Sequence, residues 1–116
     1  MVKRRPVVVL CPSISWRPGL CTVVGLSTTA PDPVRSYHCK LILNPPLPHP
    51  WAAEMWVKGD MVATVGFHRL DLIRLPGQDE SKRRIYRMNP LAADQLKDVR
   101  TCVLRGLGMF QLTRHL

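Results

Sequence analysis

The stretch Lys3-Arg4-Arg5-Pro6-Val7-Val8-Val9-Leu10 joins a cluster of positive charge to a β-branched apolar run. The run predicts a fully buried strand over Val7 to Cys11, because short apolar runs bounded by turn formers are typical of such strands. Pro6 fixes the backbone direction into that strand. We therefore expect the guanidinium groups in front of it to be held by a rigid element, which suits phosphate binding.

A second strand is predicted over Thr22 to Leu26, and the hydroxyl run Ser27-Thr28-Thr29 follows it. Arginines and hydroxyls at the ends of neighbouring strands form a candidate site for a phosphodiester. The basic cluster and the hydroxyl run each have an alternative interpretation. The basic cluster is also typical of solvated gatekeepers that oppose aggregation. The hydroxyls are also typical of a turn before Pro31, in which they bond the local backbone.

Length and composition predict one small globular domain of 116 residues. The order of predicted elements divides it into a barrel over about 5–87 and a helix over about 90–107. Lys and Arg number 17 against 8 Asp and Glu, which gives a net charge of +9. Such an excess favours a polyanionic partner, namely nucleic acid, an anionic membrane or an acidic protein. A basic protein with no such partner is the alternative. No apolar run is long enough to span a membrane and no signal peptide is evident, so we expect a cytoplasmic protein.

The remaining segments predict short strands followed by a helix. Alternation predicts strands over Tyr37 to Leu43 and Arg69 to Leu75, and Arg84 to Arg87 is a candidate hairpin partner after a turn over Pro76 to Lys82. Two further short strands, Trp56 to Lys58 and Met61 to Val65, surround Gly59-Asp60, which is typical of a hairpin turn. The helix is predicted from an Asn89 N-cap, from Pro90, and from apolar residues at spacings of three and four: Leu96, Val99, Val103 and Leu107. Many short strands followed by one helix indicate a mainly β, barrel-like domain.

The other reactive side chains point to no metal or cofactor. The four cysteines lack metal-ligand spacing and are expected to be buried free thiols: Cys11, Cys21, Cys39 and Cys102. None of the four histidines has a carboxylate partner in sequence, and His68 is the hardest of them to assign to the surface. Trp16 and Trp51 lie in loops and are candidates for contact with a base or a partner, whereas Trp56 lies in a strand and is a candidate for the core.

The order of these pieces resembles the MazF/PemK-like toxins of type II toxin–antitoxin systems. The resemblance is carried by Arg4 to Leu10, by Cys21 to Thr29, by Trp56 to Val65, by Arg69 to Ile73 and by the terminal helix. It covers nearly the whole chain as an ordered set, although no single motif is very specific. It implies an SH3-like small barrel of the MazF/PemK/CcdB kind, a homodimer, and a growth-inhibiting hydrolase that a cognate antitoxin protein restrains.

The activity implied by the resemblance is metal-independent endoribonuclease cleavage of single-stranded RNA, leaving 2′,3′-cyclic phosphate and 5′-OH ends. The family's catalytic arginine maps onto Arg5, and its assisting hydroxyl maps onto Ser27 or Thr28. The candidate RNA-binding residues around them are Lys3, Arg4, Thr29, Lys58 and Asp60. Arginine is a poor general base in water, so an electrostatic role suits Arg5 better.

The chain departs from the family pattern at two places. The family begins with a further strand and loop, with a Gly-Asp near its start, and this stretch does not precede Arg4. The resemblance therefore implies an N-terminally shortened member, and the missing strand would expose a sheet edge. Gly25 also stands where the family often has proline. A barrel that binds RNA or a partner protein but has lost nuclease activity is the alternative function.

Overall fold

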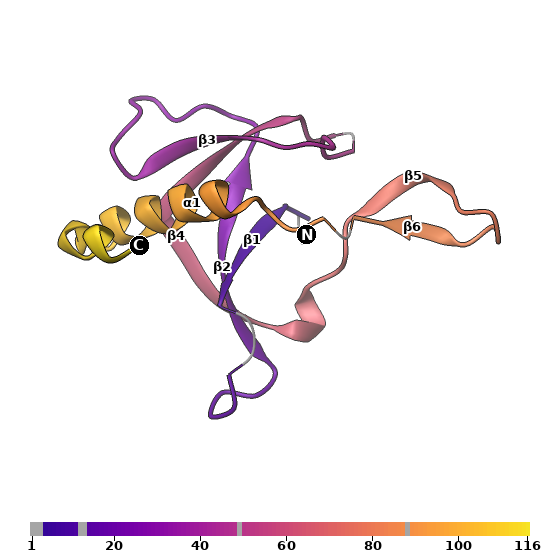
Figure 1. Cartoon of the computed structure of the whole chain (residues 1–116), viewed down its shortest axis with the longest axis horizontal. Helices are drawn as coiled ribbons and strands as arrows, with labels where there is room; N and C mark the ends of the chain where they lie inside the picture. Colours follow the sequence, from indigo (N-terminus) through magenta and orange to yellow (C-terminus); the bar gives the residue numbers. More distant parts are fainter. Residues whose placement is uncertain (1–3, 12–13, 49, 88) are drawn as a thin grey trace.

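The computed structural model describes residues 4–11, 14–48, 50–87 and 89–116. These residues form a mainly β structure with one α-helix near the end of the chain (Figure 1). In chain order the elements are β1 (Val7–Cys11), β2 (Leu20–Ser27), β3 (His38–Ile42), β4 (Glu54–Gly66), the 3-10 helix η1 (Phe67–Arg69), β5 (Arg74–Gln78), β6 (Arg84–Tyr86), α1 (Ala93–Gly106) and the 3-10 helix η2 (Phe110–His115).

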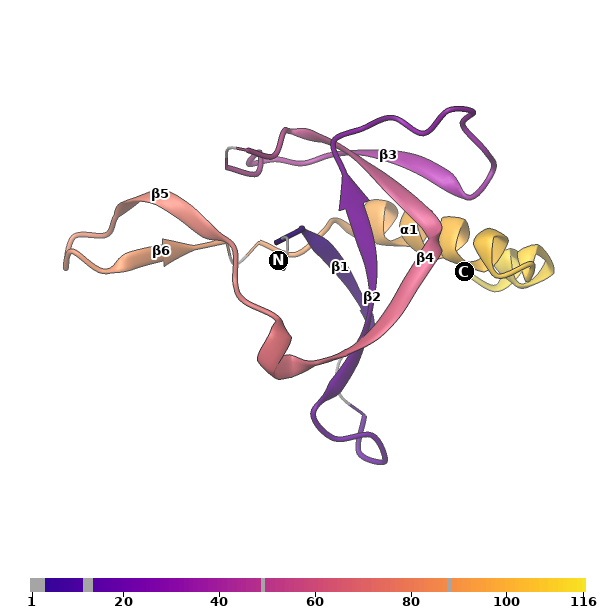
Figure 2. The ribbon, with the colours of Figure 1, turned by 180° about the vertical axis from the view of Figure 1, so that it is seen from behind.

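The main sheet has four antiparallel strands in the order β1-β2-β4-β3. Its register slips where Val24 pairs with Val62 but Leu26 pairs with Val57, so β4 carries extra residues at this point. Such a bulge bends a strand and increases its twist. The sheet accordingly curls into a half-barrel, and α1 lies across it (Figures 1 and 2). The mainly β, barrel-like expectation is confirmed at this coarse level.

β1 has the predicted bounds, but the prediction that it is fully buried is wrong. Val8 is buried, whereas Val9 is 45% exposed and Leu10 is half-buried. Within the described residues β1 pairs with β2 alone and forms an edge of the sheet. Successive side chains of a strand point to opposite faces of the sheet, so Val9 lies on the face opposite buried Val8 and the apolar run is only partly covered.

The predicted turn at Gly59-Asp60 is wrong, because both residues lie inside the continuous strand β4. Gly59 is buried, and a Cβ added there would collide with the backbone carbonyl of Cys102 in α1. A Cβ added at Gly106 would lie 2.6 Å from the Gly59 carbonyl carbon. The two glycines therefore allow the backbones of α1 and β4 to touch, which explains a glycine inside a strand.

The helix begins later than predicted, at Ala93, with Ala92 rather than Asn89 at the N-cap. The Ala92 N–H donates to the Gln95 side-chain oxygen at 3.3 Å, and Gln95 also donates to the Ile42 carbonyl at 2.7 Å. The Gln95 side chain thus supplies the N3 half of a capping box, by accepting from the N-cap N–H, and fastens α1 to the end of β3.

The hairpin prediction is right in kind and wrong in position. Residues 67–69 form the 3-10 helix η1, and the first hairpin strand is Arg74–Gln78 instead of Arg69 to Leu75. Pro76 and Gly77 lie within β5, in the irregular step between the pairs Leu75–Ile85 and Gln78–Arg84. Gly77 has a φ of 90°, which glycine adopts readily.

The core lies between the curled sheet and α1. Its fully buried side chains include Val24, Leu41, Met55, Val57 and Val99. Val99 and Val103 bear out the predicted apolar stripe, whereas Leu107 lies beyond α1 and is exposed. No helix among the described residues is long and apolar enough to cross a membrane.

Candidate functional site

A polar pocket of about 460 Å³ lies where the start of β1 meets the end of β2. Its described lining includes three cations, Arg4, Arg5 and Lys58, and the three successive hydroxyls Ser27, Thr28 and Thr29. Pro6, Leu26, Pro50, Trp51 and Met55 complete it. Cations and hydroxyl donors around one cavity are the groups that bind a phosphate.

Antiparallel pairing explains why these residues meet. The N–H of Leu26 donates to the Pro6 carbonyl at 3.0 Å, just beyond the pair formed by Val7 and Gly25. Arg5 precedes Pro6 and Ser27 follows Leu26, so the same antiparallel pairing brings both residues to one pocket. Lys58 enters from β4, where Leu26 pairs with its neighbour Val57.

Ser27 is the half-buried hydroxyl of the three, while Thr28 and Thr29 are exposed. The Ser27 Oγ accepts a hydrogen bond from the Thr29 N–H at 3.1 Å. The turn interpretation of this hydroxyl is therefore correct. It leaves the hydroxyl hydrogen of Ser27 available for a second partner, because Oγ is used here only as an acceptor.

Six of the eight predicted site residues line this pocket. Asp60 does not, since it is exposed further along β4, and Lys3 lies outside the described residues. Of the two loop tryptophans, Trp51 lines the pocket and is half-buried. Trp16 is 81% exposed in the loop that joins the other ends of β1 and β2.

The described histidines lie elsewhere. His38 accepts the Arg35 N–H through Nδ1 at 2.9 Å, His68 is exposed in η1, and His115 is exposed in η2. His49 lies outside the described residues. Within the part of the chain that the structure describes, no group of three or more His, Cys, Asp or Glu side chains could hold a metal ion.

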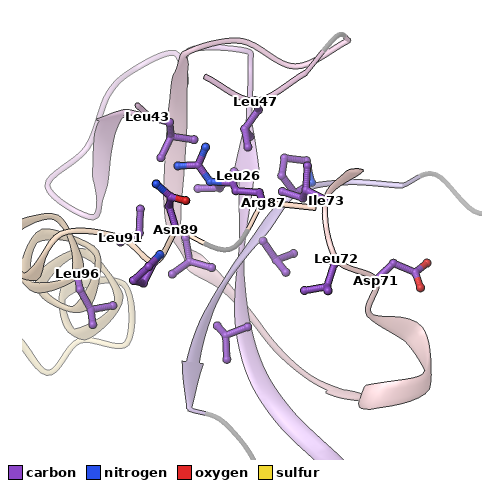
Figure 3. Close-up of a pocket in the computed structure, with 15 residues that line it drawn as sticks. Leu26, Leu43, Leu47, Asp71, Leu72, Ile73, Arg87, Asn89, Leu91 and Leu96 are labelled. Atoms are coloured by element: carbon purple, nitrogen blue, oxygen red, sulfur yellow. The ribbon is translucent and has the colours of Figure 1, made fainter. Parts of the chain in front are cut away.

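A second, apolar pocket of about 390 Å³ adjoins the first, and Pro6 and Leu26 line both. Its lining comes from four distant segments, including Val8 of β1, Leu47 of the proline-rich loop, Ile73 before β5 and Leu96 of α1. Figure 3 shows the lining side chains around the cavity, with Leu47, Ile73 and Leu96 among those labelled. Periodicity within one segment contains no signal for such a cavity, and the sequence analysis missed it.

Two cysteines meet where α1 packs on β3. The thiols of Cys39 and Cys102 share a hydrogen bond, which lowers the pKa of Cys102 and raises the pKa of Cys39. Cys102 is buried and Cys39 is half-buried, and burial further raises the pKa of Cys39. Cys21 is also buried with a free thiol, as predicted.

No protein-family model matches the chain, and no curated protein matches it.

Proposed function

We propose that this protein is a toxin of the MazF/PemK-like kind, an SH3-like barrel that cleaves single-stranded RNA without a metal. The observation that carries the proposal is the polar pocket, in which Arg4, Arg5 and Lys58 share a cavity with the Ser27-Thr28-Thr29 hydroxyls. The pocket includes Arg5, Ser27 and Thr28, onto which the resemblance maps the catalytic arginine and the assisting hydroxyl, and its cations have the charge that a phosphodiester requires.

The reaction is attack of an RNA 2′-OH on the adjacent phosphate. The bond from O2′ to phosphorus forms, the bond from phosphorus to O5′ breaks, and the proton lost from O2′ is balanced by one gained at O5′. Negative charge grows on the phosphate oxygens during the step. Arg5 stabilises that charge, and the Ser27 hydroxyl, whose oxygen is held by the Thr29 N–H, donates to a phosphate oxygen.

One observation favours binding without cleavage as the second candidate function. The described lining of the polar pocket contains no histidine or carboxylate, the side chains that most often transfer protons in catalysis. A barrel that uses the same cations and Trp51 to hold RNA needs no such group.

The partners of the proposed toxin are an antitoxin and a second copy of the chain. An antitoxin segment rich in acidic residues would cover the cations of the polar pocket. The exposed apolar side chains after α1 offer a surface for a homodimer, namely Leu107, Met109, Phe110, Leu112 and Leu116. Cytoplasmic RNA would be the target.

The test is cleavage of end-labelled single-stranded RNA in EDTA, with analysis of the product ends. We expect cyclic phosphate ends from the wild-type protein and a loss of about a hundredfold in rate for Arg5→Ala. Arg100→Ala is the matched control, because Arg100 is exposed on α1 and lies outside the pocket lining. Intact RNA that is bound through Arg5 would favour the binding module, and RNA that is neither cut nor bound would refute both candidates.

A further inference from the structure

The β5–β6 hairpin stands apart from the main sheet. β5 and β6 pair only with each other among the described strands, and the hairpin projects to one side of the molecule, away from η2 (Figures 1 and 2). Five residues of β5 at roughly 3.3 Å each give an arm about 17 Å long. Because this arm does not contribute to the core, its exposed face is available to bind a partner.

The pairing register gives the hairpin two different faces. Leu75 lies opposite Ile85, and both are half-buried. Arg74 lies opposite Tyr86 and Gln78 lies opposite Arg84, which places these four exposed side chains on the other face. Tyr86 is 37% exposed. Arg74 lies opposite it, and Arg84 stands two positions before it on β6.

The charge of the hairpin is largely uncompensated. Residues 74–87 contain five Lys and Arg against two Asp and Glu. The Asp79 carboxylate accepts the backbone N–H groups of Ser81 and Arg83 at 2.8 and 2.9 Å, so it holds the turn. The ion pair found among the described residues joins Lys40 to Glu54, away from the hairpin.

The base of the hairpin lines the apolar pocket, which shares Pro6 and Leu26 with the polar pocket. Ile73 and Arg87, which flank the two strands, line the apolar pocket together with Pro6. Pro6 in turn follows Arg5 and also lines the polar pocket. The Arg87 guanidinium donates to the Pro45 carbonyl, which holds this base against the body of the protein. The apolar pocket thus lies between the polar pocket and the hairpin, with Arg87 in its lining on the hairpin side.

We propose that this face, formed by Arg74, Arg84 and Tyr86, binds single-stranded RNA that flanks the phosphodiester in the polar pocket. The inference rests on the proposed function. Guanidinium groups hold phosphates bidentately, and a tyrosine between them offers a surface on which a base stacks. The two strand steps from Arg84 to Tyr86 cover about 7 Å, which at roughly 3.4 Å for each stacked nucleotide matches about two nucleotides.

The test compares a 15-nucleotide and a 4-nucleotide single-stranded RNA, with affinity measured across a range of salt concentrations. For the 15-mer, Arg74→Ser/Arg84→Ser should lower the salt slope by about 1.4, which is the loss of two phosphate contacts, and Tyr86→Leu should weaken binding about tenfold. For the 4-mer, affinity and cleavage should stay at the wild-type level. Lys97→Ser/Arg100→Ser is the control, since it removes the same charge from exposed positions of α1.

Wild-type affinity and salt slope in the hairpin variants would overturn the inference even if RNA is cleaved. Reduced 15-mer affinity without any cleavage would support the hairpin surface and refute the nuclease. Polyglutamate is a probe for any acidic chain. If it binds as tightly as the 15-mer, and if Tyr86→Leu weakens the binding of neither polymer, the hairpin is a general contact for acidic chains and the inference is overturned. Arg74→Lys/Arg84→Lys retains the charges and should keep most of the salt slope, which separates charge loss from misfolding.

Discussion

The polar and apolar pockets share the wall formed by Pro6 and Leu26, yet the rest of their linings differ in origin. The polar lining comes mainly from strand ends and a loop, where Arg5 and Thr28 are exposed. The apolar lining includes Leu43 and Leu47, which belong to the buried core. The exposed polar side chains of the polar pocket can therefore serve a ligand, whereas Leu43 and Leu47 of the apolar pocket contribute to the core.

The largest effect should come from the wall that both pockets share. We expect Leu26→Ala to lower the free energy of unfolding by about 3 kcal/mol, because it leaves a cavity in the core, and to weaken RNA binding as well. Urea unfolding and RNA titration measure the two effects. Leu20→Ala on the same strand is the control, since Leu20 is exposed and should cost much less. A Leu26→Ala variant as stable as the wild-type protein would contradict the role of Leu26 in the core.

A crossed pair of variants separates the two pockets. Leu47→Ala should lower the free energy of unfolding by about 2 kcal/mol and leave the salt slope of RNA binding unchanged. Arg5→Ala should change the free energy of unfolding by less than about 0.5 kcal/mol, because Arg5 is exposed, while it removes one phosphate contact. If Leu47→Ala and Arg5→Ala lower the free energy of unfolding equally, the two pockets do not differ in their contribution to stability.

A smaller effect distinguishes two hydroxyls within the polar pocket. Ser27→Ala should cost about 1 kcal/mol of stability, because the Thr29 N–H loses its acceptor, and it should slow RNA cleavage. Thr28→Val keeps the shape of the side chain and should leave stability unchanged. Unfolding and cleavage assays on both variants assign the assisting hydroxyl. A greater loss of cleavage in Thr28→Val would transfer that role to Thr28.

The smallest effect should be a pH dependence that lies outside both pockets. In the unfolded chain both thiols ionise near pH 9.0. The lowered pKa of Cys102 makes the folded state gain stability as pH rises toward that value. The raised pKa of Cys39 makes stability fall above it, because only the unfolded chain then releases that proton.

Thermal unfolding between pH 7 and 10.5 measures this dependence. We expect a shallow maximum of stability in the wild-type protein and a loss of that maximum in Cys39→Ala. Cys21→Ala is a control for removal of a buried thiol, because Cys21 lies on β2. A change in the pH dependence of RNA binding in Cys39→Ala would link the thiol pair to a pocket, contrary to expectation.

The polar site was more predictable than much of the fold around it. An antiparallel pair places the start of one strand beside the end of the other, so the neighbouring positions of Arg5 and Ser27 follow from two strands and one loop. The edge position of β1 does not follow, because an apolar run does not reveal how many neighbours it has. Gly59 was misassigned since glycine is typical both of turns and of close backbone contact, and only the position of α1 decides between them.

The missed features depend on residues far apart in the sequence. The helix start at Ala93, with Ala92 as N-cap, depends on Gln95, whose side chain donates to the Ile42 carbonyl of β3. The position of β5 depends on a bulge at Pro76 and Gly77 that local alternation does not contain. The SH3-like class of the barrel and the toxin function remain predictions from the resemblance.

The contact between Gly59 and Gly106 also limits how this sequence can change. A side chain at either position would meet the backbone of the other element, so shrinking a neighbouring side chain cannot make room for it. We expect a saturation screen to find both sites intolerant, with no second mutation at the partner glycine that restores folding. Two positions that contribute no side chain to any pocket would then rank among the least variable of the chain.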